Sequence, residues 1–250
     1  MNYGLWMSAA GLATEVHRQD TIANNVANAN TVGFKPEVSF TRERPIAREE
    51  LGATTPAQFM LERLGGGVLA ANTRTVFDQG DLQAEQGPLD VAILGEGFFV
   101  VQDTDGERYT RDGRFNRDDR GRLVDLDGRP VLSDRGREIR LDEGLVDIQS
   151  DGSIMVGGEQ VARLALKAPE TSALIKQGDN LFKLADGAAS PGAAADATVL
   201  QNHLESSGVD PIASLADLVE SGRSVQASAR FIELHDRMME LAVNRIAAVG

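Results

Sequence analysis

The two ends of this chain carry the pattern that most constrains its fold, a long apolar stripe whose spacing alternates between three and four residues. The stripe near the N-terminus consists of Leu5, Ala9, Leu12, Val16, Gln19, Ala23, Val26 and Asn30. The stripe near the C-terminus consists of Leu218, Gly222, Val225, Ala229, Ile232, Asp236, Met239, Val243 and Ile246. A helical stripe with a period of about 3.5 residues is a seam that another helix must cover. The pattern therefore predicts two long helices, each of which needs helical partners.

The opposite side of the predicted C-terminal helix carries a second apolar stripe. It consists of Ala227, Phe231, Leu234, Met238 and Leu241. One antiparallel partner covers only one stripe, and burial of each Phe, Leu or Met side chain contributes about 1.5 to 3 kcal/mol. The second stripe either packs on the β domain of the same chain or is buried by several neighbouring subunits. The small residues of the N-terminal stripe offer little covering area, which favours burial by neighbouring subunits.

Turn-forming residues divide the chain into four predicted regions. These are an N-terminal assembly helix in 1–35, a connector in 36–67, a β-rich outer domain in 68–204 and a C-terminal assembly helix in 205–250. The first helical pattern runs from Gly4 to Ala29 and stops before Gly33. Asp210 and Pro211 suit the cap and the first position of the last helix.

Glycine-containing turns recur at short intervals between residues 68 and 204 and leave no room for crossover helices. The strands between them should therefore pair as antiparallel hairpins. The predicted fold is a mainly β, antiparallel and hairpin-rich central domain with long N- and C-terminal α-helices, which form a coiled-coil-like assembly domain.

The composition excludes several classes of function. The 250-residue chain has a formal net charge of −13, whereas nucleic acids and anionic membrane surfaces require a basic face. The absence of cysteine excludes disulfides and thiolate chemistry. No apolar run has the length of a membrane span, and the first residues lack the basic start and apolar core of a signal peptide. We expect no nucleic-acid partner, no membrane insertion and no cleaved signal.

The sequence also lacks the spacing of a catalytic or metal site. His17, His203 and His235 are far apart, and neither an H-E-x-x-H motif nor a complete dinucleotide-binding loop occurs. Residues 103–106 and 125–128 resemble calcium loops but lack the closing glutamate, and hairpin turns explain them better. We expect no catalytic residue, cofactor, metal or small-molecule substrate. The alternative is a soluble β-domain enzyme or ligand-binding protein that dimerises through its terminal helices.

Asn24, Asn25 and Asn28 lie outside the N-terminal stripe, within a segment with a helical pattern. Asparagine is a poorer helix former than alanine, so these residues need another explanation. A side-chain amide both donates and accepts hydrogen bonds, which suits a packed but polar face between subunits. A solvated face near a frayed helix end explains them equally well.

Three segments resemble those of the bacterial flagellar rod and hook protein family. Residues 22–35, IANNVANANTVGFK, are similar to its N-terminal signature, with Val26 where leucine is usual. Residues 90–132 resemble its β-domain motif, which includes the run Tyr109-Thr-Arg-Asp-Gly113. Residues 206–246 resemble its closing helix, although Ser224-Val225-Gln226 stands where an aromatic residue and a glutamate often follow the arginine.

The resemblance implies a structural subunit of the flagellar basal-body rod, which spans the periplasm and serves as the axial drive shaft for motility. It implies export through the flagellar type III machinery without a cleaved signal, and partners that are copies of this chain and paralogous rod proteins. Chain length and the Pro88-Leu89-Asp90 lead-in favour a proximal rod subunit. A distal rod subunit, or another axial protein of the hook and basal body, is the alternative.

The expected assembly interface draws on both terminal segments. It comprises Leu5, Leu12, Val16, Asn24, Asn25, Val26, Asn28, Asn30, Gly33, Phe34, Leu218, Val225, Ala229, Phe231, Ile232, Leu234, Met238, Met239, Val243 and Ile246.

Overall fold

The computed structural model describes residues 3–44 and 67–247, with side chains from 4 to 44 and from 67 to 244. The chain forms two compact units. The helical unit comprises 1–27, 37–76 and 210–250, and the β unit comprises 28–36 and 77–209. The backbone therefore passes between the units at four points, 27/28, 36/37, 76/77 and 209/210.

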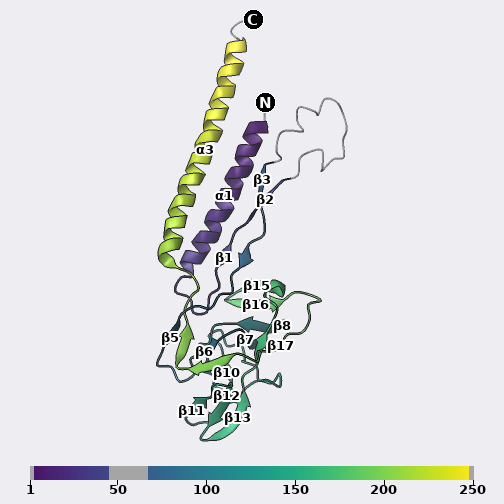
Figure 1. The fold of residues 1–250 in the computed structure, drawn as a ribbon, viewed down its shortest axis with the longest axis vertical. Coiled ribbons are helices and arrows are strands. Elements are labelled where there is room, and N and C mark those ends of the chain that lie inside the picture. The colour runs from purple at the N-terminus through teal and green to yellow at the C-terminus, as the bar shows by residue number, and fades with distance from the viewer. Residues whose placement is uncertain (1–2, 45–66, 248–250) are drawn as a thin grey trace. The chain divides into compact units, whose positions relative to one another are not determined.

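Two long helices dominate the helical unit (Figure 1). Helix α1 (Tyr3–Ala27) packs along helix α3 (Pro211–Ala247). The helices run antiparallel, because Gly4 lies against His235 whereas Gly222 lies against Gln19. The prediction of long terminal helices is confirmed. No described helix has both the length and the apolar character needed to cross a bilayer.

Two short strand pairs complete the described part of the helical unit. Strand β1 (Glu37–Val38) pairs with β4 (Arg74–Thr75). Strand β2 (Thr41–Glu43) pairs with β3 (Val68–Ala70), and β3 packs on α1. The predicted connector, residues 36–67, is therefore partly strand where it is described.

Helix α3 begins where the sequence predicts. The Asp210 Oδ1 atom accepts the backbone N–H of Ile212 at 2.9 Å and that of Ala213 at 3.1 Å. These bonds satisfy amides that have no partner in the first turn. Pro211 occupies the first helical position, where its missing N–H has no cost.

Helix α1 ends at Ala27, two residues before the predicted Ala29. The Asn25 amide donates to the Glu37 carbonyl at 2.7 Å and accepts the Glu37 N–H at 3.0 Å. This paired contact holds the returning chain against the last turn of the helix. Asn30, which the spacing assigned to the helical stripe, lies beyond the helix, and that extension of the stripe is wrong.

The β unit is built from short strands that all pair antiparallel, as predicted. Its strands are β5 (Leu82–Ala84), β6 (Val91–Leu94), β7 (Phe98–Asp103), β8 (Gly106–Thr110), β9 (Asn116–Arg117), β10 (Leu123–Val124), β11 (Val146–Ile148), β12 (Ser153–Val156), β13 (Glu159–Arg163), β14 (Leu166–Ala168), β15 (Leu174–Gly178), β16 (Leu181–Leu184), β17 (Gly192–Ala193), β18 (Thr198–Gln201) and β19 (His203–Glu205), with a 3-10 turn, η2 (Thr171–Ala173). The largest sheet has the order β15-β16-β8-β7-β14-β17. A second sheet is β11-β12-β13, and β6–β18, β5–β19 and β9–β10 form pairs.

Strand β7 lies between two buried clusters. Its side chains alternate, because successive residues of a strand point to opposite faces. Phe99 and Val101 join the larger cluster, whereas Phe98 and Val100 join a smaller one that also contains Phe182. The uninterrupted apolar run of β7 therefore reflects burial on both faces.

Three successive turns in the β unit are built alike. They span Asp118–Arg122, Asp125–Arg129 and Ser133–Arg137, and in each the first side-chain oxygen accepts the last residue's backbone N–H. The fourth residue of each turn is a glycine with φ between +69° and +83°, a region that other residues rarely adopt. The Asp125 carboxylate thus binds its own turn, which agrees with the hairpin interpretation.

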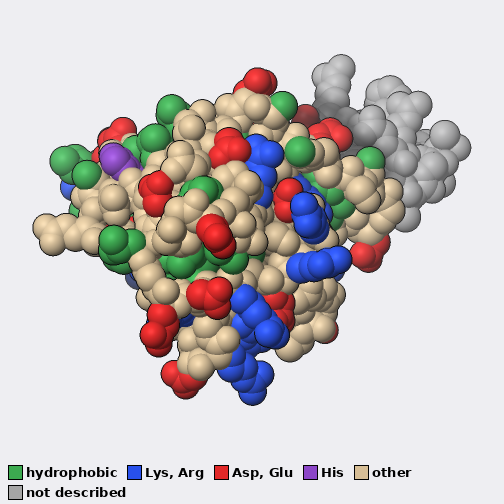
Figure 2. Space-filling model, turned by 90° about the horizontal axis from the view of Figure 1, so that it is seen from below, with side chains coloured by type: hydrophobic (Ala, Val, Ile, Leu, Met, Phe, Trp, Pro, Cys, Tyr) green, Lys and Arg blue, Asp and Glu red, His purple; other side chains and the backbone are tan. Residues whose placement is uncertain are grey.

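The residues that follow these turns close a ring of backbone hydrogen bonds. The N–H of Leu123 donates to the carbonyl of Ile139, that of Val131 to Leu123 and that of Ile139 to Val131, at 2.9 to 3.3 Å. All three side chains are buried in the larger cluster. The hairpins therefore form a three-part cap on the core of the β unit, a repeat that the sequence analysis did not recognise. Figure 2 shows acidic and basic side chains interspersed on one face of the molecule.

Replacement of Gly113 by alanine should strongly destabilise the β unit. A Cβ atom at this position would lie 1.7 Å from the Val91 carbonyl oxygen, so the backbone of strand β6 must shift. We expect Gly113→Ala to lower the free energy of unfolding by about 3 kcal/mol or more, measured by urea unfolding of the purified chain.

Gly192→Ala is the matched control, because a Cβ atom at Gly192 would meet nothing within 4 Å. We expect a change within about 0.5 kcal/mol. Similar losses in the two variants would contradict the close approach at Gly113.

Candidate functional site

Helices α1 and α3 partly bury the sides that face each other. The half-buried members of the predicted interface are Leu5, Leu12, Val26, Leu218, Val225, Ala229, Ile232 and Met239. Close approach depends on small residues, because a Cβ atom at Gly4 would lie only 3.3 Å from the His235 ring. Gly222 of the α3 stripe lies against Gln19 of the α1 stripe, whereas Ala9, Val16 and Ala23 of the α1 stripe are exposed.

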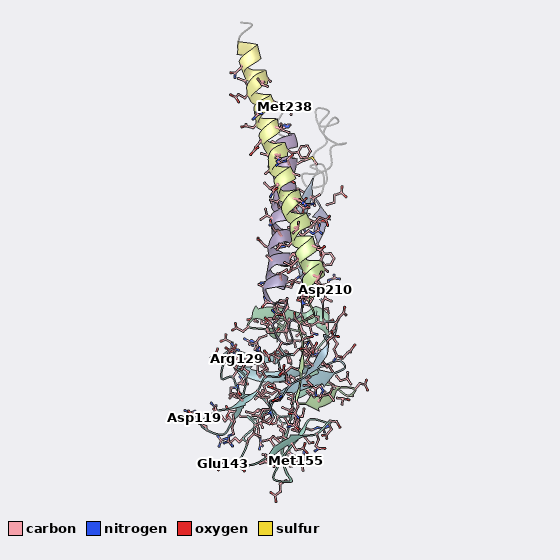
Figure 3. All side chains as sticks on the ribbon, turned by 90° about the vertical axis from the view of Figure 1, so that its left-hand side faces the viewer. Asp119, Arg129, Glu143, Met155, Asp210 and Met238 are labelled. Atoms are coloured by element: carbon pink, nitrogen blue, oxygen red, sulfur yellow. The ribbon has the colours of Figure 1, made fainter. Side chains whose placement is uncertain are left out.

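The second stripe of α3 is exposed in the described chain. Phe231 is 68% exposed, Leu234 53% and Met238 58%, and Ala227 and Leu241 are exposed as well. Figure 3 marks Met238 on α3, well along the helix from Asp210. An apolar surface of this extent on a long helix is typical of an interface with another protein.

Helix α3 is also longer than its partner. It has 37 residues and α1 has 25, a difference of about 18 Å at 1.5 Å per residue. Because Gly4 lies against His235, the last turns of α3 extend past the start of α1. Val243, a predicted interface residue, is 61% exposed there. Ile246 belongs to α3, but its side chain lies outside the described residues.

The other predicted residues of the N-terminal segment have mixed surroundings. Val16, Asn24 and Asn30 are exposed. Asn25 binds the backbone of Glu37, and the Asn28 Oδ1 atom accepts a hydrogen bond from the Thr31 hydroxyl at 3.1 Å. Asn25 therefore holds residue 37 against the last turn of α1, whereas Asn28 binds within the turn that follows the helix. Neither sequence interpretation considered these contacts within the subunit.

Gly33 and Phe34 lie inside the β unit. Gly33 has φ of +66°, and a Cβ atom there would lie 2.6 Å from the carbonyl of Arg111. Its N–H donates to the Glu205 carbonyl at 2.7 Å, and Phe34 is 4% exposed. Lys176 Nζ lies 4.1 Å from the centre of the Phe34 ring. Gly33 is thus required by close backbone packing as well as by the turn after α1.

A buried cluster of three charged side chains lies beside this segment. Lys35, Arg111 and Glu205 are 0%, 5% and 1% exposed. The Lys35 ammonium contacts Glu205 Oε1 at 2.5 Å, and Arg111 Nη1 donates to Glu205 Oε2 at 3.1 Å. One carboxylate therefore accepts charge-assisted bonds from two cations, which are among the strongest hydrogen bonds in proteins.

Backbone groups complete the charge cluster. Lys35 Nζ donates to the Asp78 carbonyl at 2.6 Å, and the Gly80 N–H donates to Glu205 Oε1 at 2.9 Å. Arg111 Nη2 donates to the Gly95 carbonyl at 2.7 Å. The cluster thereby connects stretches of the chain that are far apart in sequence.

Burial shapes the electrostatics of the cluster. Desolvation lowers the pKa of Lys35 and that of Arg111, and the Glu205 carboxylate opposes both shifts. Two cations around one carboxylate leave a net positive charge, so each cation also disfavours the other. The Glu205 carboxylate is essential to the cluster, because its removal would leave two buried cations without a counter-ion.

Sequence reasoning missed this cluster. Lys35 and Arg111 stand in two of the recognised segments, but neither was assigned a role, and Glu205 lies just before the third. Lys35 and Glu205 are 170 positions apart, so no local spacing links them. In both segments the charged residue stands near a glycine and an aromatic residue. This pattern suggests that the charged side chain is buried, but it does not identify its partner.

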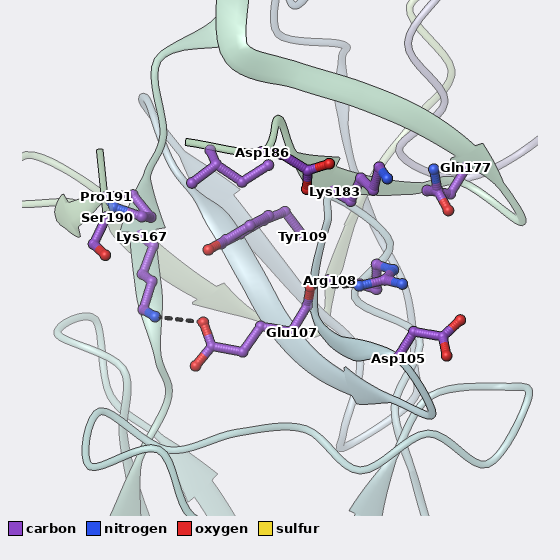
Figure 4. A pocket seen from close by; sticks show the side chains of 11 residues that line it. Asp105, Glu107, Arg108, Tyr109, Lys167, Gln177, Lys183, Asp186, Ser190 and Pro191 are labelled. Atoms are coloured by element: carbon purple, nitrogen blue, oxygen red, sulfur yellow. Dashed lines mark hydrogen bonds and ion pairs between the residues drawn. The ribbon is translucent and has the colours of Figure 1, made fainter. Parts of the chain in front are cut away.

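A polar hollow of about 470 Å³ lies on the β unit. Figure 4 shows Tyr109 among charged side chains, and Glu107 pairs there with Lys167 at 2.7 Å. Its charges balance, with Asp105, Glu107 and Asp186 against Arg108, Lys167 and Lys183. Among the described residues no group of three or more histidines, aspartates or glutamates is placed to hold a metal.

Removal of the negative charge of Glu205 should strongly destabilise the chain. Glu205→Gln leaves Lys35 and Arg111 buried without their counter-ion, and we expect a loss of about 3 to 5 kcal/mol in the free energy of unfolding. Urea unfolding of the purified chain measures it.

Glu107→Gln is the control, because it breaks a partly exposed ion pair with Lys167. It should cost less than about 1 kcal/mol. If Glu205→Gln lowered the free energy of unfolding by no more than this control does, the cluster would not be a buried, paired site.

Comparison with known proteins covers both units. Residues 7–35 match the family described as flagella basal body rod protein, 92–156 match the D1 domain of the flagellar hook protein FlgE/F/G, and 200–245 match the C-terminal region of the flagellar basal body rod FlgEFG proteins. The chain is 36% identical to the flagellar basal-body rod protein FlgF of Caulobacter vibrioides, with 100% of both chains covered. It is 31% identical to FlgG of Borreliella burgdorferi, with 98% of each chain covered.

The relatives align with the helices and the β unit alike, and the matched segments contain all three members of the buried charge cluster, Lys35, Arg111 and Glu205. The chain therefore belongs to the flagellar basal-body rod family of structural, non-enzymatic proteins, and within it resembles FlgF.

Proposed function

We propose that this rod protein joins the axial drive shaft through its terminal helices. Helix α1 covers one side of α3 within the subunit, and neighbouring rod subunits cover the other side. The observation that carries this proposal is the exposed stripe of Phe231, Leu234, Met238 and Leu241 along α3. Burial of each of these side chains contributes about 1.5 to 3 kcal/mol, enough together to drive association.

The proposal includes a division of roles between the two regions of the chain. The terminal segments form the assembly interface, and the β-rich region is the outer domain that they carry. The β unit supports this division, since it has two buried apolar clusters of its own. The exposed large apolar side chains of α3 have no such use within the described chain.

We infer a proximal rod position and export through the flagellar type III machinery without a cleaved signal. The proximal position follows from the likeness to FlgF over the whole chain. A distal position is the second candidate, because FlgG relatives also align over nearly the whole chain. The export route is proposed from the membership of the chain in the flagellar basal-body rod family.

Charges placed in the exposed stripe should block assembly without unfolding the subunit. In Phe231→Asp/Met238→Asp, two carboxylates replace apolar side chains that neighbours are proposed to bury. We expect the variant to be produced and secreted, to be absent from purified basal bodies and to leave the cells non-motile. Immunoblots of purified basal bodies and a swimming assay measure this.

The control is Gln226→Asp/Glu233→Asp, which alters exposed polar positions on a side of α3 outside both stripes. It should assemble and support swimming. Normal incorporation of the stripe variant would show that this surface is not an assembly interface.

A charge in the seam should have the same cellular effect for a different reason. Leu12→Asp removes an apolar contact from the half-buried face of α1 and should separate α1 from α3. We expect loss of rod assembly with an unchanged melting temperature of the β unit, because Leu12 belongs to the helical unit. The exposed neighbour Ala13 provides the control Ala13→Asp, which adds the same charge outside the seam and should assemble. A large fall in the β-unit melting temperature in Leu12→Asp would contradict the division into two units.

A further inference from the structure

All four points at which the backbone passes between the units lie close in sequence to the buried charge cluster. Lys35 lies next to the passage at 36/37, Asp78 follows the passage at 76/77, and Glu205 shortly precedes that at 209/210. Gly33 follows the first passage and donates to the Glu205 carbonyl at 2.7 Å. Force carried by the helical unit can reach the β unit through the backbone only along these segments.

The passing segments are bound to one another as well as to the cluster. The Gly208 N–H donates to the Phe34 carbonyl at 2.9 Å, next to the bond from Gly33 to Glu205. The Gly80 N–H donates to Glu205 Oε1 at 2.9 Å, and Lys35 Nζ reaches the Asp78 carbonyl at 2.6 Å. The segments 33–35, 78–80 and 205–208 are therefore held as one set.

Arg111 connects this set to the core. It follows strand β8, and its guanidinium binds both Glu205 and the carbonyl of Gly95, just beyond strand β6. The guanidinium also lies 5.2 Å from the centre of the Phe98 ring on strand β7. A pull on any of the passing segments is thus opposed by the central strands of the β unit.

We propose that Lys35, Arg111 and Glu205 form the mechanical joint through which torque in the terminal helices reaches the β unit. Buried ion clusters add little to stability compared with apolar residues of the same size, but their bonds are directional and hold the passing segments in one register. This proposal rests on the proposed role of the terminal helices in the shaft. The three residues act as positioning residues for that role.

The test uses the full-length chain with Lys35→Met, which keeps the Arg111–Glu205 pair and removes the bond to Asp78. Hydrogen exchange of the purified variant should accelerate by about tenfold or more at Gly33, Gly80 and Gly208, as in local opening. Amides of the core ring, such as Leu123 and Val131, should keep their protection. The variant subunit should assemble into rods, yet its cells should lose swimming speed in viscous medium more than in dilute medium.

The matched control is Lys167→Met, which breaks the partly exposed ion pair with Glu107 away from the passing segments. It should leave exchange at the three glycines and swimming at both viscosities unchanged. Lys35→Met cells that swim like the wild type in viscous medium would overturn the proposal, and so would failure of this variant to assemble. Unaltered exchange at the three glycines would overturn it without any reference to rod assembly, so its failure is distinguishable from that of the proposed function.

Discussion

The burial of the Glu205 carboxylate is the interaction on which the rest of the β unit's connections depend. A carboxylate that is 1% exposed is unstable unless cations and backbone donors surround it. Here the donors come from positions 35, 80 and 111. Each donor belongs to a different stretch of the chain. The hydrogen bonds to the Glu205 carboxylate therefore bring together the residues that follow α1, those that precede β5 and those that follow β8.

The two units differ in how far they bury their apolar side chains. In the β unit, strand β7 has a buried cluster on each face, and three hairpins close over the larger one. In the helical unit, α1 covers one side of a longer α3 and leaves Phe231, Leu234 and Met238 exposed. This contrast supports the proposal that neighbouring subunits cover the exposed side of α3.

Local features were predictable because their causes are local. The spacing of apolar residues predicted both helices, and Asp210 with Pro211 predicted the start of α3, since a cap involves only residues within one turn. The density of glycine turns predicted antiparallel hairpins, because a glycine with positive φ shapes its turn without distant help. The end of α1 was less predictable, since it depends on a contact between Asn25 and Glu37.

The sequence by itself determined the helical periods, the caps, the turns, the acidic charge and the three family segments. Only the tertiary structure decided that Gly33 packs against the Arg111 backbone, that the Asn25 amide binds the Glu37 backbone and that Lys35 pairs with Glu205. The physical reason is range. Helices and turns arise from residues within a few positions of one another, whereas a buried charge takes whichever partners the folded chain brings within hydrogen-bond distance, here 94 and 170 positions away.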